Sequence, residues 1–239
     1  ITWPKYTQIP ITEEKLSGNT LKILDGSKLE IQGSANRALS AITLREPFDF
    51  HFQSLNSENF YFQLHSSFNS GPMELRFSDL DHLSQSRPLQ WNLELFQDEV
   101  PTAFFAAAND LSPLLEFETR NLQIQIKDDL GVESYSLEMN STRGEMIFLQ
   151  KTILKHFIRN DLEKEINLSF PFEPGFFGLE DGDQVSFTIL AKDRFPNRKY
   201  TRSKPLKLII LGSEKHAQRI TEKMEDLMDQ AREWATQIA

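Results

Sequence analysis

Short stretches in which apolar and polar residues alternate are the feature that most constrains the fold of this chain. Phe48, Phe50 and Phe52 alternate with polar residues, and this period-two pattern recurs as far as Ile210. Such alternation gives a strand one apolar and one hydrated face. Turn-rich segments such as 54–58 and 66–71 separate the stretches, an arrangement typical of an antiparallel β-sandwich. The other sets are Phe60/Phe62/Leu64, Met73/Leu75/Phe77, Trp91/Leu93/Leu95, Leu122/Ile124/Ile126, Tyr135/Leu137/Met139, Val185/Phe187/Ile189/Ala191 and Leu206/Leu208/Ile210.

The two halves of the chain resemble each other. The tetrapeptide at 29–32, Leu-Glu-Ile-Gln, recurs 93 positions later as Leu-Gln-Ile-Gln at 122–125. The tetrapeptide at 88–91, Pro-Leu-Gln-Trp, recurs 117 positions later as Pro-Leu-Lys-Leu at 205–208. The difference of 24 predicts an insertion between 140 and 181, where the run 154–165 fits a short helix or a long hairpin. Chance similarity of Leu- and Ile-rich strands is the alternative explanation.

We therefore expect an all-β fold of two tandem Ig-like antiparallel β-sandwiches, followed by a C-terminal amphipathic helix. The first sandwich covers 1–99 and the second covers 100–212, with its insertion near 140–165. At 239 residues the chain has room for about two domains.

The last 27 residues, 213–239, carry a heptad pattern without Gly or Pro. Apolar residues recur at alternating steps of three and four, which predicts a helix that forms a coiled coil. The alternative is an amphipathic helix docked on the second sandwich, although such helices usually have a wider apolar stripe. The interaction seam consists of Ala217, Ile220, Met224, Leu227, Ala231, Trp234 and Ile238.

Composition excludes several classes of protein. A net charge of −9 gives no basic excess of the kind that nucleic-acid binding requires, so no nucleic-acid partner is expected. The chain has no cysteine, which rules out disulfides and Cys-based metal sites. It contains no apolar run of 18 residues, so membrane contact is expected only through segments absent from this chain. Because the chain begins with Ile, we expect it to be a piece of a longer protein or a mature form.

Acidic turns raise the possibility of calcium binding. Loops at one end of a sandwich can converge, and Ca²⁺ takes six to eight oxygen ligands. The spacing fits no EF-hand, however, and Asp-Gly sequences are also what ordinary turns require. The candidate calcium ligands are Asp128, Asp129, Asp181, Asp183 and Asp193.

A basic run at 192–207 holds seven cations and one acid, with Phe195 and Tyr200 among them. It fits contact with an anionic polymer, a lipid headgroup surface or an acidic partner. A solvated loop whose lysines protect a sheet edge is the simpler interpretation. The candidate anionic-partner patch is Lys192, Arg194, Arg198, Lys199, Arg202 and Lys204.

No catalytic motif is present in the sequence. The five histidines are scattered, and there is no His-Glu-x-x-His, Gly-x-Ser-x-Gly or phosphate-binding Gly-rich loop. We therefore expect neither enzymatic activity nor a cofactor, although a site assembled only in space would leave no such motif. Trp3, Trp91 and Trp234 could stack on a sugar, but two of them lie on patterned apolar faces, which favours buried positions.

Several turn motifs together resemble a family of uncharacterised bacterial envelope proteins, known only as a domain of unknown function. They are Pro4-x-Tyr6-Thr7-x-x-Pro10, Gly26-Ser27, Ile31-x-Gly33 with Asn36, the 128–132 turn Asp-Asp-Leu-Gly-Val, Gly182-Asp183-x-Val185 and Ala191-x-Asp193. In that family, membrane helices precede Ig-like or cadherin-like modules and long coiled-coil segments follow them. The resemblance implies an extracytoplasmic, periplasmic location beside the inner membrane and assigns no catalytic residue. The insertion after Asn140 departs from the family pattern.

Together these observations predict a non-enzymatic structural or interaction segment of a bacterial envelope protein. Its partner would be another protein, or a second copy of itself, bound through the C-terminal helix. The alternatives are a Ca²⁺-dependent adhesion or glycan-binding β-sandwich module, and an enzyme whose site assembles only in the folded chain.

Overall fold

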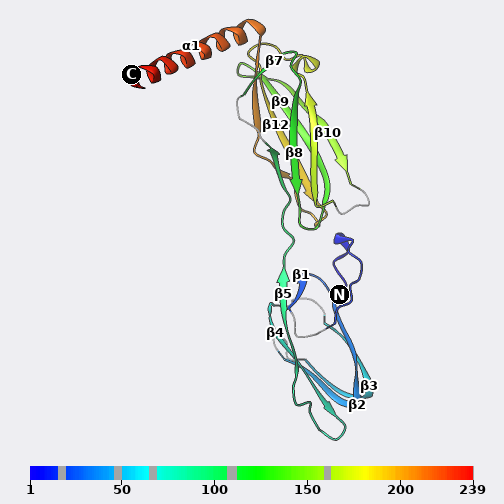
Figure 1. Cartoon of the computed structure of the whole chain (residues 1–239). Coiled ribbons are helices and arrows are strands. Elements are labelled where there is room, and N and C mark those ends of the chain that lie inside the picture. Colours follow the sequence, from blue (N-terminus) through cyan, green and yellow to red (C-terminus); the bar gives the residue numbers. More distant parts are fainter. Residues whose placement is uncertain (16–19, 46–49, 65–68, 107–111, 159–162, 239) are drawn as a thin grey trace. The chain divides into compact units, whose positions relative to one another are not determined.

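The computed structural model describes residues 1–15, 20–45, 50–64, 69–106, 112–158 and 163–238; within them it does not describe the side chains of 50–56, 112, 216, 219, 223, 233 and 235–238. The chain is mostly β-strand and carries one long helix at its C-terminal end (Figure 1). It divides into two compact units, Ile1–Glu99 and Val100–Ala239. The predicted mostly-β fold with a C-terminal helix is confirmed.

The first unit begins with a 3-10 turn, η1 (Lys5–Thr7). Its strands are β1 (Thr20–Leu24), β2 (Leu29–Arg45), β3 (Phe50–Leu64), β4 (Gly71–Asp79) and β5 (Leu89–Phe96). They form one hydrogen-bonded sheet in the order β1-β5-β4-β2-β3. The β1–β5 pair is parallel and all other pairs are antiparallel.

Strands β2 and β3 are long, and their ladder is interrupted by a bend. The first part of β2 pairs only with β3, from Leu29 opposite Leu64 to Ser34 opposite Asn59. The register then shifts, and the last part of β2 pairs with both β3 and β4. The turn predicted at 54–58 is therefore wrong, because bulged residues bend a strand without ending it.

One apolar core holds the first unit together. Leu29 and Ile31, from before the bend, belong to the same buried cluster as Ile42 and Leu44, from after it. Strands β1, β4 and β5 add further members, including Ile23, Met73, Leu75, Trp91 and Leu93. The bend thus lets a single sheet, whose β2–β3 ladder is interrupted, enclose a core.

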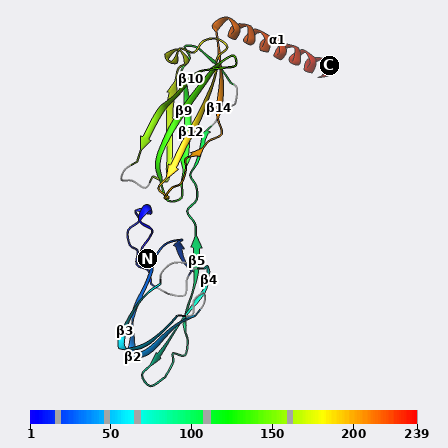
Figure 2. The same ribbon diagram turned by 180° about the vertical axis from the view of Figure 1, so that it is seen from behind.

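The second unit has two sheets. The strands are β6 (Thr102–Ala106), β7 (Ser112–Leu115), β8 (Arg120–Lys127), β9 (Val132–Arg143), β10 (Met146–Phe157), β11 (Glu165–Phe172), β12 (Gln184–Asp193), β13 (Thr201–Arg202) and β14 (Leu206–Leu211). One sheet has the order β10-β9-β12-β14-β7, with β13 on β12, and the other has the order β11-β8-β6. Figure 2 shows β10, β9, β12 and β14 lying side by side in that order. A 3-10 turn, η2 (Pro174–Phe177), connects β11 to β12.

The two sheets of the second unit share one core. Ile124 and Ile126 from the smaller sheet and Leu137 and Ile189 from the larger one lie in the same buried cluster. The rings of Phe172 and Phe187 meet edge to face across it, with centroids 4.7 Å apart.

Strands β6 and β7 were not predicted from the sequence, because they are short and their residues do not alternate between apolar and polar.

Strand pairing relates the two units by the offsets of their repeated sequences. In both, the strand before the repeated motif pairs in parallel with the last strand: β1 with β5, and β7 with β14. Thr20 lies opposite Asn92, and Pro113 lies opposite Ile209. Pro113 follows Thr20 by 93 positions and Ile209 follows Asn92 by 117, the offsets of the two tetrapeptides. The repeat is therefore present in the strand pairing as well as in the amino-acid sequence.

The extra residues of the second unit are spread over several connections. Ile31 lies opposite Phe62, and the corresponding Ile124 lies opposite Leu168, which follows Phe62 by 106 positions. The offset between the units thus grows from 93 at Ile31 to 106 at Phe62. Of the 24 extra residues of the second unit, 13 therefore lie before Leu168 of β11, and the others follow it. The helical option for 154–165 is wrong for the described part, because 154–157 are in β10, which forms a hairpin with β9.

Candidate functional site

The helix α1 (Ser213–Ile238) presents the predicted interaction seam to solvent. Leu227 is 64% exposed, Met224 is 58% exposed and Ile220 is 47% exposed. Trp234 is 67% exposed, although its apolar pattern had favoured a buried position. Ala217 and Ala231 are also exposed, whereas the side chain of Ile238 is not described. Since burial of apolar area stabilises association, a row of uncovered large side chains is the signature of a contact surface.

The seam is wider than the heptad pattern indicated. Met228, adjacent to Leu227 and one turn beyond Met224, is 56% exposed. In the seven-residue repeat, whose positions are written a to g, the seam residues occupy positions a and d. Met228 directly follows Leu227, which is at d, so it lies beside the seam and broadens the apolar stripe. Sequence reasoning missed it by counting only positions a and d, although its spacing of four from Met224 marks it as a neighbour on the helix surface.

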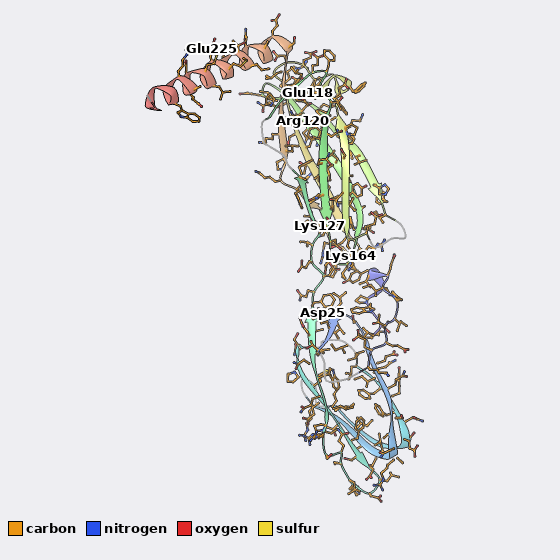
Figure 3. All side chains as sticks on the ribbon, viewed as in Figure 1. Asp25, Glu118, Arg120, Lys127, Lys164 and Glu225 are labelled. Carbon is orange, nitrogen blue, oxygen red and sulfur yellow. The ribbon has the colours of Figure 1, made fainter. Side chains whose placement is uncertain are left out.

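The polar face of α1 is mainly acidic. Glu222, Glu225, Asp226 and Asp229 are all exposed, and Figure 3 labels Glu225 on this helix. Arg232 forms an ion pair with Asp229 at 3.1 Å, which spans three residues of the helix. These charges keep the polar face hydrated, so the apolar stripe is the part of α1 suited to a partner.

The start of α1 is held to the second unit through Asp181. The backbone N–H of Gly212 donates to Asp181 Oδ1 at 2.9 Å, and Lys215 Nζ lies 2.6 Å from Asp181 Oδ2. The hydrogen bond from Lys215, with that from Gly212, keeps the pKa of Asp181 below its ordinary value. A side chain at Gly212 would place its Cβ 3.3 Å from the Asp181 side chain, so this close approach favours glycine.

The five candidate calcium ligands do not come together. Strand β12 begins opposite Thr142 and ends with Asp193 opposite Val132, so its two ends are about 30 Å apart at 3.3 Å per residue. Asp181 and Asp183 precede its first residue. Asp128 and Asp129, in the turn between β8 and β9, lie near Asp193 at the other end. A single ion cannot contact both groups.

Asp183 serves as the buried partner of an arginine. It is 1% exposed and accepts two hydrogen bonds from Arg143, from Nε and Nη2, each at 2.8 Å. The backbone N–H of Glu180 donates to the same carboxylate at 2.9 Å. The hydrogen bonds from Arg143 keep the pKa of Asp183 below its ordinary value. This carboxylate is therefore occupied within the chain.

Asp128 is a buried carboxylate in a turn. Its Oδ2 accepts the backbone N–H groups of Leu130 and Gly131, whereas its Oδ1 is buried and makes no hydrogen bond. Burial raises the pKa of Asp128 to about 6, with smaller contributions from the neighbouring charges of Asp129 and Asp193. Among the described residues, no group of three or more His, Asp or Glu side chains is placed to hold a metal ion.

Most cations of the basic run are paired within the second unit. Lys192 contacts Glu133 at 2.8 Å, Arg202 contacts Glu138 at 2.6 Å, and Arg198 pairs with Asp193. Arg198 also stacks over the ring of Phe195, and Arg194 donates to the carbonyl of Ile158. Lys199 and Lys204 are exposed. The run therefore presents much less free positive charge than its composition indicates.

The remaining candidates do not form a site among the described residues. Trp91 is 3% exposed, and Trp3 donates its indole N–H to Thr12 Oγ1 at 3.1 Å, so both serve the fold. His156 packs against Tyr135 with ring centroids 5.3 Å apart. His51, His65 and His216 lie outside the described side chains. Across the described parts of the chain, no helix combines the length and apolarity that crossing a membrane would need.

Comparison with known proteins gives no family for this chain. No protein-family description matches the sequence, and no curated protein matches it either. Fibronectin(III)-like modules of Clostridium thermocellum CbhA match at 11% identity over 83% of this chain and 92% of theirs, with a TM-score of 0.32. The titin domains z1z2 in complex with telethonin match at 11% identity over 82% and 93%, with a TM-score of 0.33. The DIP-gamma IG1+IG2 structure matches at 9% identity over 81% and 94%, with a TM-score of 0.29.

Proposed function

We propose that this chain is a non-enzymatic interaction and spacer segment of a bacterial envelope protein, and that it assembles through α1. In this proposal the two units are tandem Ig-like β-sandwiches and α1 belongs to a coiled coil. The observation that carries the proposal is the exposed seam of α1, in which Leu227 and Trp234 are each more than 60% exposed.

The alternative arrangement, with α1 docked on the second unit, has no support in the described side chains. Ile220, Met224, Leu227 and Trp234 are all exposed, whereas a docked helix buries one face. The tie at Asp181 fixes only the first turn of α1 and leaves the seam open. An isolated helix of this length is marginal in water, so a partner helix would stabilise it.

Two related β units support the spacer part of the proposal. Each has its own buried core, and each pairs the strand before its repeated motif in parallel with its last strand. Among the described residues of both units, no group of three or more His, Asp or Glu side chains is placed to hold a metal ion. The envelope location rests on the resemblance of the turn motifs alone.

Sedimentation of the purified chain over a wide concentration range tests the assembly. We expect the mass to rise with concentration, and Leu227→Glu to abolish that rise by placing a charge in the seam. Gln218→Glu, which adds the same charge to the exposed polar face, should leave it intact. A monomer at every concentration, or equal behaviour of the two variants, would contradict assembly through the seam.

Protease protection tests the location. An antibody against this segment should detect it in the inner-membrane fraction, and protease added to spheroplasts should degrade it without lysis. Detection only in the cytosol would contradict an envelope role while leaving the assembly result untouched.

Calcium titration tests the rival adhesion module. With the five acids split between two ends of β12 and Asp183 occupied by Arg143, we expect no change of melting temperature on adding calcium. A rise of several degrees that Asp129→Asn or Asp183→Asn removes would favour the rival.

A further inference from the structure

A second apolar surface lies at the end of the second unit where α1 begins. Phe176 in η2 is 82% exposed, and Phe117, in the turn between β7 and β8, is 77% exposed. The two segments are in contact: the N–H of Gly175 donates to the carbonyl of Glu116 at 2.9 Å, and the Phe117 ring lies against Gly175. Two large, exposed aromatic side chains thus lie on segments that contact each other.

The β9–β10 hairpin extends this apolar surface. Met146 is 75% exposed and Ile147 is 71% exposed, directly after the hairpin turn. The ring of Phe148 lies under the Arg143 guanidinium, 4.5 Å from its carbon, and Arg143 Nη2 reaches the carbonyl of Gly178 at 3.5 Å. Arg143 therefore connects the hairpin to the loop that carries Phe176. We call Phe117, Met146, Ile147, Phe148 and Phe176 the end surface.

The end surface lies in acidic surroundings. The segments that form it, with the adjacent Arg120 and Lys215, contain three basic residues, of which the third is Arg143. Their seven acidic residues are Glu116, Glu118, Glu145, Glu173, Glu180, Asp181 and Asp183. Each of the three cations is already engaged: Arg143 with Asp183, Lys215 with Asp181, and Arg120 with Glu118. The local charge is therefore negative by four. Figure 3 shows Glu118 and Arg120 at this end, with Lys127 and Lys164 at the opposite one.

This charge decides between possible occupants. An anionic lipid surface would be repelled, because the segments that carry the aromatic side chains also carry carboxylates such as Glu118, Glu145 and Glu180. A second copy of the chain carries a net charge of −9, so it would bring further negative charge to a surface that is already acidic. A segment of another protein that carries both basic and apolar side chains complements the surface in charge and in polarity.

We propose that the end surface is a docking site for a cationic, apolar segment of a partner protein. Aromatic side chains of the segment cover Phe117 and Phe176, and its Lys or Arg side chains pair with the surrounding carboxylates. This contact is separate from assembly through α1, since it uses other residues and another partner. It places a binding surface beside the point where α1 leaves the sheets.

Fluorescence anisotropy of the full chain with a labelled peptide, four repeats of Lys-Leu-Arg-Trp, tests the proposal. We expect the double variant Phe117→Ser, Phe176→Ser to bind the peptide about tenfold more weakly or worse, because buried aromatic side chains dominate interfaces. Phe157→Ser is the matched control, an exposed Phe at the far end of β10, and should bind normally. Glu145→Lys should weaken binding, and Glu163→Lys, at the opposite end of the unit, should not.

The outcomes separate the alternatives. Equal binding by the double variant and the wild type, equal weakening by Phe157→Ser, or no peptide binding at all would overturn the proposal. Weakening by Leu227→Glu instead would place the site on α1. Binding to phosphatidylglycerol vesicles together with no peptide binding would point to a membrane surface. A control peptide with Glu in place of Lys and Arg should not bind, and binding of that peptide would also overturn the proposal. Since the substituted side chains are exposed, unchanged melting temperatures will show that the variants fold.

Discussion

Asp128 gives the sharpest prediction, because a buried carboxylate with a raised pKa makes stability depend on pH in a known direction. In the folded chain burial raises its pKa from an ordinary 3.8 to about 6. The folded state therefore binds the proton more tightly than the unfolded state does. The contribution of Asp128 to stability is largest at low pH, falls as pH rises from about 4 to 6, and is lost above that range.

The size of the effect follows from the two pKa values. Between pH 7.5 and pH 5 the linkage relation gives the wild type a gain of about 1.4 kcal/mol from this one group. Asp128→Asn has no such proton to bind, while its amide oxygen can still accept from Leu130 and Gly131. The difference in unfolding free energy between variant and wild type should therefore shift in favour of the variant by about 1.4 kcal/mol on going from pH 5 to pH 7.5.

Native-state hydrogen exchange of β9 and β12 amides, read by mass spectrometry, measures this difference for the second unit alone. That choice matters because two units need not unfold in one transition. Asp229→Asn, which removes an exposed carboxylate on α1, outside the strands that are measured, is the control. A difference for Asp128→Asn that is the same at both pH values would refute the reasoning.

Three further predictions follow from other contacts. Replacing Arg143 with Met leaves the buried Asp183 carboxylate without its ion pair and should lower the stability of the second unit by about 2–3 kcal/mol, measured by exchange of the β12 amides. That loss should shrink as the pH falls below 4, because the pKa of Asp183 is lowered in the folded state and its contribution disappears on protonation. Phe187→Ala should cost about 3–5 kcal/mol in the same assay by opening a cavity between the sheets. Gly33→Ala should cost about 1 kcal/mol by thermal melting, since the new Cβ would lie 2.5 Å from the Phe60 ring, and Phe60→Leu should restore most of it.

The two surfaces proposed for binding differ in how far sequence could locate them. A heptad is a local pattern, so the α1 seam could be read from spacing alone, apart from Met228. The end surface is built from three segments that are distant in sequence: the turn at Phe117, the start of β10 at Phe148, and η2 at Phe176. No spacing rule joins these residues, and a lone Phe in a turn-rich stretch carries no period. Only the pairing of the strands that hold the loops brings them to one end.

The acidic and basic motifs also show that sequence alone does not locate a binding surface. Asp-rich turns and a run of seven cations are visible as composition, but composition does not say which charge faces which. Asp183 lies 40 positions from Arg143, and Glu133 lies 59 positions from Lys192, yet both pairs are in contact. Because opposite charges that meet across strands neutralise each other, the tertiary structure decided that these motifs are largely internal pairs.

The sequence by itself determined the strand-rich character of the chain, most strand positions, the helix at 213–238 and the two offsets that relate the units. These features depend on period-two and heptad patterns, which act over a few residues and are fixed by backbone geometry. The tertiary structure alone decided that β3 continues through the turn predicted at 54–58, because the register shifts there and pairing with β2 resumes beyond the shift. It also decided which apolar side chains stay in water, since burial depends on what the rest of the chain can cover.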